Sequence, residues 1–92
     1  MTTCYINGKY KPLSQSTVSV TDRGYQFSDG VYEVIAVFKN EFVDFKLHLN
    51  RLFVSLKKMD MKINLNKNQI ESIIKKIKKI NQLEMGIVYI QI

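Results

Sequence analysis

The sequence has few of the residues that form disulfide bonds or bind metal ions. It has one cysteine, one histidine, one proline and no tryptophan in 92 residues. Cys4 cannot form an internal disulfide, so nothing in the chain requires an oxidising compartment. No second histidine, cysteine or carboxylate cluster stands at metal-ligand spacing around His48, so no metal site is predicted. His48 and Cys4 are therefore interpreted as structural residues.

Long apolar runs and a leader-like segment are also missing. The longest unbroken apolar run is Val34–Phe38, far short of the about 20 residues that a membrane-spanning helix needs. The first residues have no basic segment followed by an apolar one, which is the pattern of a secretory signal. We expect a soluble cytoplasmic protein that does not bind a membrane.

The composition is that of a small globular protein. Hydrophobic residues make up 46% and charged residues 24% of the 92 residues, which suits a single domain spanning residues 1–92. A chain of this size buries roughly 60–65% of the surface that its unfolded form exposes, so its stability margin is small. Association with a partner would add to it, and a homo-oligomer is expected.

The net charge of +6 is a weak indication of nucleic-acid binding. Most of the excess is lysine, and no recognisable reading element accompanies it, so we predict no nucleic-acid partner. The run Lys75, Lys76, Lys78 and Lys79 lies opposite an isoleucine stripe. A solvated helix face is favoured there over an anion-binding face, since cations also suit a helix C-terminus.

The apolar pattern predicts an α+β domain with a mainly antiparallel sheet and two consecutive helices packed on it. Asn7-Gly8 predicts a hairpin turn within Cys4–Tyr10. Asn66 and Gln69 form the pattern of a capping box before the second helix. The predicted strands are Cys4–Ile6, Lys9–Tyr10, Thr17–Val20, Val31–Phe38, Phe42–Phe45 and Ile87–Ile92, and the predicted helices are Lys46–Lys58 and Lys67–Ile80.

Residues 22–34, DRGYQFSDGVYEV, contain more special residues than an ordinary turn needs. Gly24 and Gly30 permit backbone conformations that other residues avoid, and Asp22 and Asp29 can bond nearby amides. Tyr32 and Glu33 follow on the strand and must point to opposite faces. A hydroxyl and a carboxylate beside a glycine-containing corner are candidates for a site.

Arg51 is the second candidate, because it lies at or beside the apolar stripe of the first predicted helix. An arginine there extends to solvent or binds an anion, and its planar fork fits carboxylate or phosphate. The residues alone leave two interpretations open, an internal salt bridge and a ligand anion.

The order DRGYQFSDGVYEV, HLNRL (residues 48–52) and GIVYIQI (residues 86–92) resembles the class IV, or fold-type IV, pyridoxal-phosphate aminotransferases. The likeness runs along the whole chain and is greatest to the D-amino acid aminotransferases. Branched-chain aminotransferases and aminodeoxychorismate lyase belong to the same family. The resemblance implies the smaller N-terminal domain of an enzyme roughly three times as long.

The resemblance also implies roles for single residues. Arg51 would bind the phosphate of pyridoxal 5'-phosphate, and Tyr32 would line the substrate pocket near the substrate carboxylate. Glu33 matches a motif position for which the resemblance gives no detailed role, and we group it with Tyr32 as a candidate substrate-binding residue. Asp22, Arg23 and Gly24 would shape the corner, and Ser28 stands where relatives commonly have glycine.

The resemblance implies one further expectation about catalysis. No lysine of this sequence stands at the position of the family's covalent lysine, whose domain would follow the matched part. We therefore assign no catalytic residue and expect a truncated or split D-amino acid aminotransferase-like protein, inactive alone. Its complete reaction would use an amino acid and a 2-oxo acid, with a second chain supplying the lysine. The alternative functions are a self-associating interaction module and, more remotely, a basic nucleic-acid binder.

Overall fold

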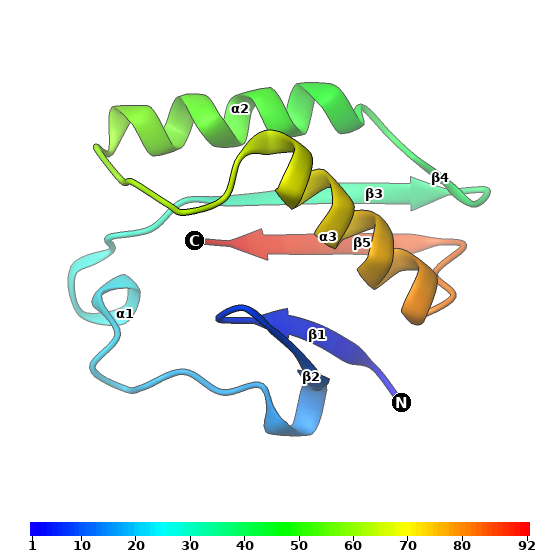
Figure 1. Ribbon diagram of the computed structural model, residues 1–92, viewed down its shortest axis with the longest axis horizontal. Helices are drawn as coiled ribbons and strands as arrows, with labels where there is room; N and C mark the ends of the chain where they lie inside the picture. The colour runs from blue at the N-terminus through cyan, green and yellow to red at the C-terminus, as the bar shows by residue number, and fades with distance from the viewer.

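The computed structural model describes all residues from 1 to 92 and contains two antiparallel sheets and three α-helices. The sheets are a hairpin of β1 and β2 and a three-stranded sheet in the order β4-β3-β5 (Figure 1). In chain order the elements are β1 Thr3–Ile6, β2 Lys9–Pro12, a 3-10 turn Leu13–Gln15, α1 Arg23–Phe27, β3 Tyr32–Phe38, β4 Glu41–Phe42, α2 Phe45–Lys58, α3 Lys67–Ile80 and β5 Gly86–Gln91. The α+β fold class with its antiparallel sheet and two consecutive helices is confirmed.

The first hairpin forms where the sequence predicts it. Asn7 and Gly8 adopt positive φ angles of 48° and 86°, which is the geometry of a two-residue turn that follows the strand twist. Tyr5 and Tyr10 face each other across the pair, with ring centroids 5.0 Å apart. Asn81 then joins this hairpin to α3, because its side chain bonds both backbone groups of Thr3.

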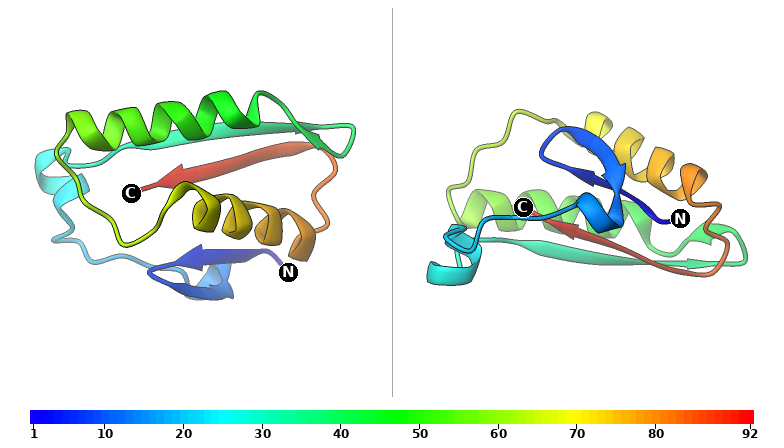
Figure 2. Two further views of the ribbon diagram at one scale, coloured as in Figure 1. Left: turned by 45° about the horizontal axis from the view of Figure 1, so that its top comes forward. Right: turned by 90° about the horizontal axis from the view of Figure 1, so that it is seen from below.

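The core lies between α2, α3 and one face of the three-stranded sheet. Seen from below, both helices lie on the same side of β3 and β5 (Figure 2). The buried apolar residues are Val31, Ile35, Val37, Leu49, Leu52, Leu56, Ile70, Ile74 and Val88. The buried residues of each helix recur with the 3.6-residue period of an amphipathic helix, and Met59 and Ile80 are exposed at the helix ends.

Helix α3 has the bounds that its sequence predicts, and its N-terminus explains why. The Asn66 side chain accepts from the Gln69 backbone N–H at 2.9 Å, and the Gln69 side chain accepts from the Asn66 backbone N–H at 2.8 Å. This reciprocal pair satisfies two donors that an uncapped helix would leave free. At the other end, the backbone N–H of Asn81 bonds the Ile77 carbonyl and closes the last turn.

Two predicted strands are wrong or shortened. Residues 17–20 are exposed and form no strand, because their weak alternation meets no partner with which to pair. The strand predicted over Phe42–Phe45 is limited to Glu41–Phe42. Asp44 adopts a left-handed conformation at φ 54°, which ends the pairing, and Phe45 becomes the first residue of α2.

The corner between residues 22 and 30 contains a short helix that the sequence pattern does not predict. Asp22 caps α1 by accepting from the Gly24 backbone N–H at 2.8 Å. The left-handed conformation falls on Ser28, at φ 56°, and neither Gly24 nor Gly30 has a φ in that range. The space around Gly30 is tight, since a Cβ there would lie 3.1 Å from the Ile92 backbone oxygen and would displace the end of the Gln91 side chain.

No helix of the structure combines the length and apolar character that crossing a membrane demands.

We expect Ser28→Gly to raise the free energy of unfolding by about 0.5–1 kcal/mol. Glycine adopts positive φ without the Cβ clash that serine meets, and this gain exceeds the entropy that glycine adds to the unfolded chain. Urea denaturation followed by circular dichroism measures the change. The matched control is Ser72→Gly in the exposed interior of α3, where the same substitution should destabilise. Destabilisation by Ser28→Gly would contradict the assigned backbone conformation.

Candidate functional site

Strand β3 separates two of the predicted site residues onto opposite faces. Its residues alternate strictly between exposed and buried from Tyr32 to Phe38, as a strand with one covered face requires. Tyr32 is 64% exposed on the outer face, and Glu33 is 4% exposed on the face toward the helices. The expectation that these neighbours point to opposite faces is confirmed.

The inner face brings Glu33, His48 and Arg51 together. Arg51 donates from Nε to Glu33 Oε2 and from Nη2 to Glu33 Oε1, each at 2.8 Å. His48 Nδ1 lies 2.7 Å from the same Oε1. Residues 48 and 51 are three positions apart on α2, so both side chains emerge from one face of the helix beside β3.

This arrangement satisfies the only buried charged residue of the chain. An ionised carboxylate accepts hydrogen bonds and donates none, so His48 Nδ1 carries the hydrogen of the bond to Glu33. The contact of 3.4 Å between Arg51 Nη2 and His48 Nδ1 therefore joins two donors and adds no hydrogen bond. No buried side-chain nitrogen or oxygen in the chain is left without a partner.

The same contacts determine the pKa of Glu33. The hydrogen bond from Arg51 lowers the pKa of Glu33 below its ordinary value, burial opposes that change, and the bond from His48 lowers it further. In return, the Glu33 carboxylate raises the pKa of Arg51, with a small contribution in the same direction from Tyr32. Both groups of the pair are thus charged at neutral pH.

Arg51 remains accessible although it is held by Glu33. Its side chain is 66% exposed, and only Nε and Nη2 contact the carboxylate. A guanidinium has five N–H donors, so the edge formed by Nη1 and the second Nη2 hydrogen is free for another acceptor. The structure therefore contains the internal salt bridge and still permits a ligand anion at the same residue.

The outer face of the sheet carries aromatic residues and almost no charge. Tyr32 stacks on Tyr89, with ring centroids 6.2 Å apart, and the Tyr89 hydroxyl donates to Gln91 Oε1. Gln91 in turn donates from Nε2 to the Val31 carbonyl. Neither Tyr89 nor Gln91 is among the residues predicted from the sequence, although their alternation on the last strand places them on the same face as Tyr32.

The corner residues lie at the N-terminal end of β3 and do not contact Glu33 or Arg51. Arg23 bonds Asp29 from Nε at 2.6 Å, and its guanidinium lies 4.7 Å from the centre of the Phe27 ring. The corner is closed against β5 by mutual backbone hydrogen bonds between Val31 and Ile92. These contacts fix the point at which β3 begins.

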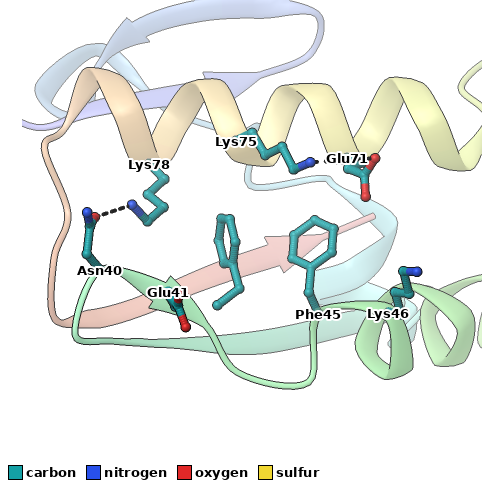
Figure 3. A pocket seen from close by; sticks show the side chains of 8 residues that line it. Asn40, Glu41, Phe45, Lys46, Glu71, Lys75 and Lys78 are labelled. Atoms are coloured by element: carbon teal, nitrogen blue, oxygen red, sulfur yellow. Dashed lines mark hydrogen bonds and ion pairs between the residues drawn. The ribbon is translucent and has the colours of Figure 1, made fainter.

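A cavity lies elsewhere in the chain, between the β3–β4 turn, the start of α2 and α3. It has a volume of about 560 Å³ and includes none of the predicted site residues. Phe42 and Phe45 lie at its apolar part, and Lys78 donates to Asn40 Oδ1 across one end (Figure 3). Lys75 pairs with Glu71 at 3.9 Å along α3.

The lysine run on α3 makes local contacts that agree with a solvated face. Lys76 lies over the Tyr10 ring at 4.4 Å, and Lys78 lies over the Phe42 ring at 6.0 Å. No group of three or more histidine, cysteine, aspartate or glutamate side chains could hold a metal ion. No lysine forms a hydrogen bond or ion pair with Glu33, His48 or Arg51.

Comparison with known proteins assigns this architecture to a family. The model of the family described as amino-transferase class IV matches residues 30–92, which include β3, both long helices and β5. The chain belongs to the class IV aminotransferases. The resemblance carried by residues 22–34, 48–52 and 86–92 is thereby confirmed at the level of the family.

Two curated relatives of this class IV chain are D-alanine aminotransferases. The enzyme of Listeria monocytogenes serotype 4b (strain F2365) is 34% identical over 87 residues, which cover 95% of this chain and 30% of the relative. The enzyme of Staphylococcus aureus (strain MSSA476) is 32% identical over 87 residues, covering 95% of this chain and 31% of the relative. The chain thus spans less than a third of the length of these relatives.

Solved structures of class IV enzymes share the fold. The branched-chain amino acid aminotransferase of T.th., complexed with N-(5'-phosphopyridoxyl)-L-glutamate, superposes with a TM-score of 0.91 at 20% identity, over 98% of this chain and 32% of that one. The branched-chain aminotransferase from Thermoproteus uzoniensis with norvaline gives a TM-score of 0.77 at 19% identity, over 92% of this chain and 30% of that one. Identities this low establish the fold alone.

We expect Glu33→Gln to lower the free energy of unfolding at pH 7 by about 1–3 kcal/mol, because the charge-assisted bonds to Arg51 are lost. The folded-state pKa of Glu33 is lowered, so its contribution is complete above the ordinary glutamate pKa and is lost as the pH falls through the lowered value. Urea midpoints of the wild type and the variant should therefore differ at pH 7 and converge in acid. A constant difference across that range would contradict the linkage.

Proposed function

We propose that this chain forms one wall of a pyridoxal 5'-phosphate site in an aminotransferase that acts on D-amino acids. The covalent lysine of that site would come from a lysine-bearing domain outside these 92 residues, on a longer polypeptide or a second chain. The reaction would move an amino group from a D-amino acid to a 2-oxo acid. Membership of the class IV family and the identity of 32–34% with D-alanine aminotransferases support this proposal.

The observation that carries the proposal is the exposed, fixed guanidinium of Arg51. Glu33 holds one edge of the group, so the free edge is available to a phosphate, whose oxygens accept paired N–H donors well. Tyr32 adds to the raised pKa of Arg51, although its side chain lies on the outer face of β3 and Glu33 holds Arg51 at the inner face. These residues fit the anionic cofactor that the family implies.

Each residue then has a role in binding. Arg51 would bind the cofactor phosphate, and Tyr32 would donate from its hydroxyl to the substrate carboxylate. Glu33 stands beside this pocket at the motif position, although both of its oxygens are engaged by Arg51 and His48. Bound pyridoxal phosphate would supply the electron withdrawal that makes the α-hydrogen of the amino acid acidic.

We expect the chain to bind pyridoxal 5'-phosphate more tightly than pyridoxal, because only the former offers a phosphate to Arg51. Arg51→Gln should weaken binding of the phosphorylated form by about tenfold to a hundredfold and leave pyridoxal binding unchanged. Equilibrium dialysis with absorbance detection measures both ligands. Arg23→Gln is the matched control, since Arg23 is an exposed arginine that pairs with Asp29. Equal affinity of the wild type for the two ligands would refute the phosphate role.

The outer face of the sheet supports a second candidate function, self-association. Its exposed apolar residues are Tyr32, Val34, Phe38, Ile87 and Tyr89, and antiparallel sheets ordinarily present polar residues to water. The three aromatic side chains are 53% to 64% exposed and offer on the order of 300 Å², which is already at the scale of a functional patch. Two copies packing these faces would exclude water from them.

We expect the wild-type chain to form dimers at tens of micromolar concentration and Ile87→Lys to shift it to a monomer, since a buried lysine at a dimer face has no partner. Multi-angle light scattering across a concentration series measures the mass. Val54→Lys is the control, because Val54 is 52% exposed on α2 and away from the outer face. A wild type that stays monomeric throughout would exclude this candidate.

A further inference from the structure

We infer that Glu33 is a positioning residue, which orients Arg51 so that one edge of the guanidinium faces a phosphoryl group. This inference rests on the proposed function and assigns a different task to a residue that the sequence analysis grouped with Tyr32 as a candidate for substrate binding. Glu33 would not touch the ligand. It would act through Arg51.

The geometry limits Glu33 to this task. Its carboxylate is 4% exposed and lies on the inner face of β3, opposite to Tyr32. Oε2 accepts from Arg51 Nε, and Oε1 accepts from Arg51 Nη2 and His48 Nδ1. Both oxygens are engaged and the carboxylate is buried, so an outside molecule cannot reach the one lone pair of Oε2 that remains free.

Arg51 needs such an anchor because its own environment does not fix it. The side chain is 66% exposed, and an unrestrained arginine there would sample many rotamers in water. The two parallel bonds to Glu33 hold the guanidinium plane in one orientation and leave its opposite edge free. A ligand that binds this edge then does not have to order the side chain itself, which raises its affinity.

The fold does not require a carboxylate at this position. The other inward residues around it are Val31, Ile35 and Val37, and all three pack into the apolar core. A buried ion pair contributes little net stability compared with apolar residues of similar volume, because desolvation opposes it. Burial therefore does not explain why residue 33 is a glutamate, whereas orientation of the Arg51 guanidinium does.

His48 completes the anchor by fixing the carboxylate. Its Nδ1–H donates to Oε1 at 2.7 Å from the same helix face as Arg51. The carboxylate is therefore held between two donors of α2, and it cannot rotate about its terminal bond without losing one of them. Three side chains from two elements thus define one orientation of the guanidinium.

The test compares Glu33→Gln, Glu33→Asp and Ile35→Val for binding of pyridoxal 5'-phosphate, with pyridoxal as the ligand that lacks the phosphate. We expect Glu33→Gln to weaken binding of the phosphorylated ligand roughly tenfold and to leave pyridoxal unchanged. Glu33→Asp, which keeps the charge, should recover part of the loss. Ile35→Val destabilises the same strand face without altering the anchor, so it should keep the wild-type preference.

A purely electrostatic role of Glu33 predicts the opposite change in affinity. If Glu33 only screened the charge of Arg51, its removal would leave a stronger net positive site and would raise the affinity for the phosphorylated ligand. Increased or unchanged affinity in Glu33→Gln therefore overturns the inference. An equal loss of affinity for the phosphorylated ligand in Ile35→Val also overturns the inference, because the effect would then come from lower stability of the fold.

A ligand-free measurement separates this inference from the proposed function. In nuclear magnetic resonance spectra, the Nε–H of a fixed arginine gives a sharp signal protected from exchange. We expect that signal for Arg51 in the wild type and its loss in Glu33→Gln. If the wild type does not distinguish the two ligands, the proposed function fails while this signal still tests the anchor. A sharp Arg51 signal in Glu33→Gln overturns the anchor whatever the ligand result.

Discussion

The buried carboxylate of Glu33 is the polar constraint that joins helix α2 to strand β3. A charged group on the covered face of a strand has to be satisfied within the protein, since water does not reach it. Arg51 and His48 satisfy it from α2, 15 to 18 residues farther along the chain. The position of α2 along β3 is therefore determined by a polar contact as well as by the leucines that surround it.

The division between the two faces of β3 follows from the two-residue period of the strand. The inner face contains the core and the anchored guanidinium, whereas the outer face contains stacked aromatic rings and open apolar side chains. Only ten of the 92 residues are buried, so the domain has little apolar area of its own with which to offset chain entropy. Any molecule that covers the outer face, a second copy or a larger domain, would add to its stability.

The elements that the sequence predicted correctly are those specified by neighbouring residues. Asn7-Gly8 determines a turn by the φ angles that it tolerates, and Asn66 with Gln69 determines a helix start by reciprocal hydrogen bonds. The errors fall where tertiary contacts decide. Thr17–Val20 alternates like a strand but has no partner, and the left-handed residue of the corner is Ser28, which no local rule selects over Gly24 or Gly30.

The sequence by itself determined the α+β class, the two helices with their apolar stripes, and the placement of Tyr32 and Glu33 on opposite faces, because these depend on periods of 3.6 and 2 residues. It also carried the family motifs, and it left the partner of Arg51 open. Only the tertiary structure decided that this partner is Glu33, with His48 as a second donor. Contacts between a strand and a helix depend on how the two elements pack, and packing angle and register are not encoded in any local pattern.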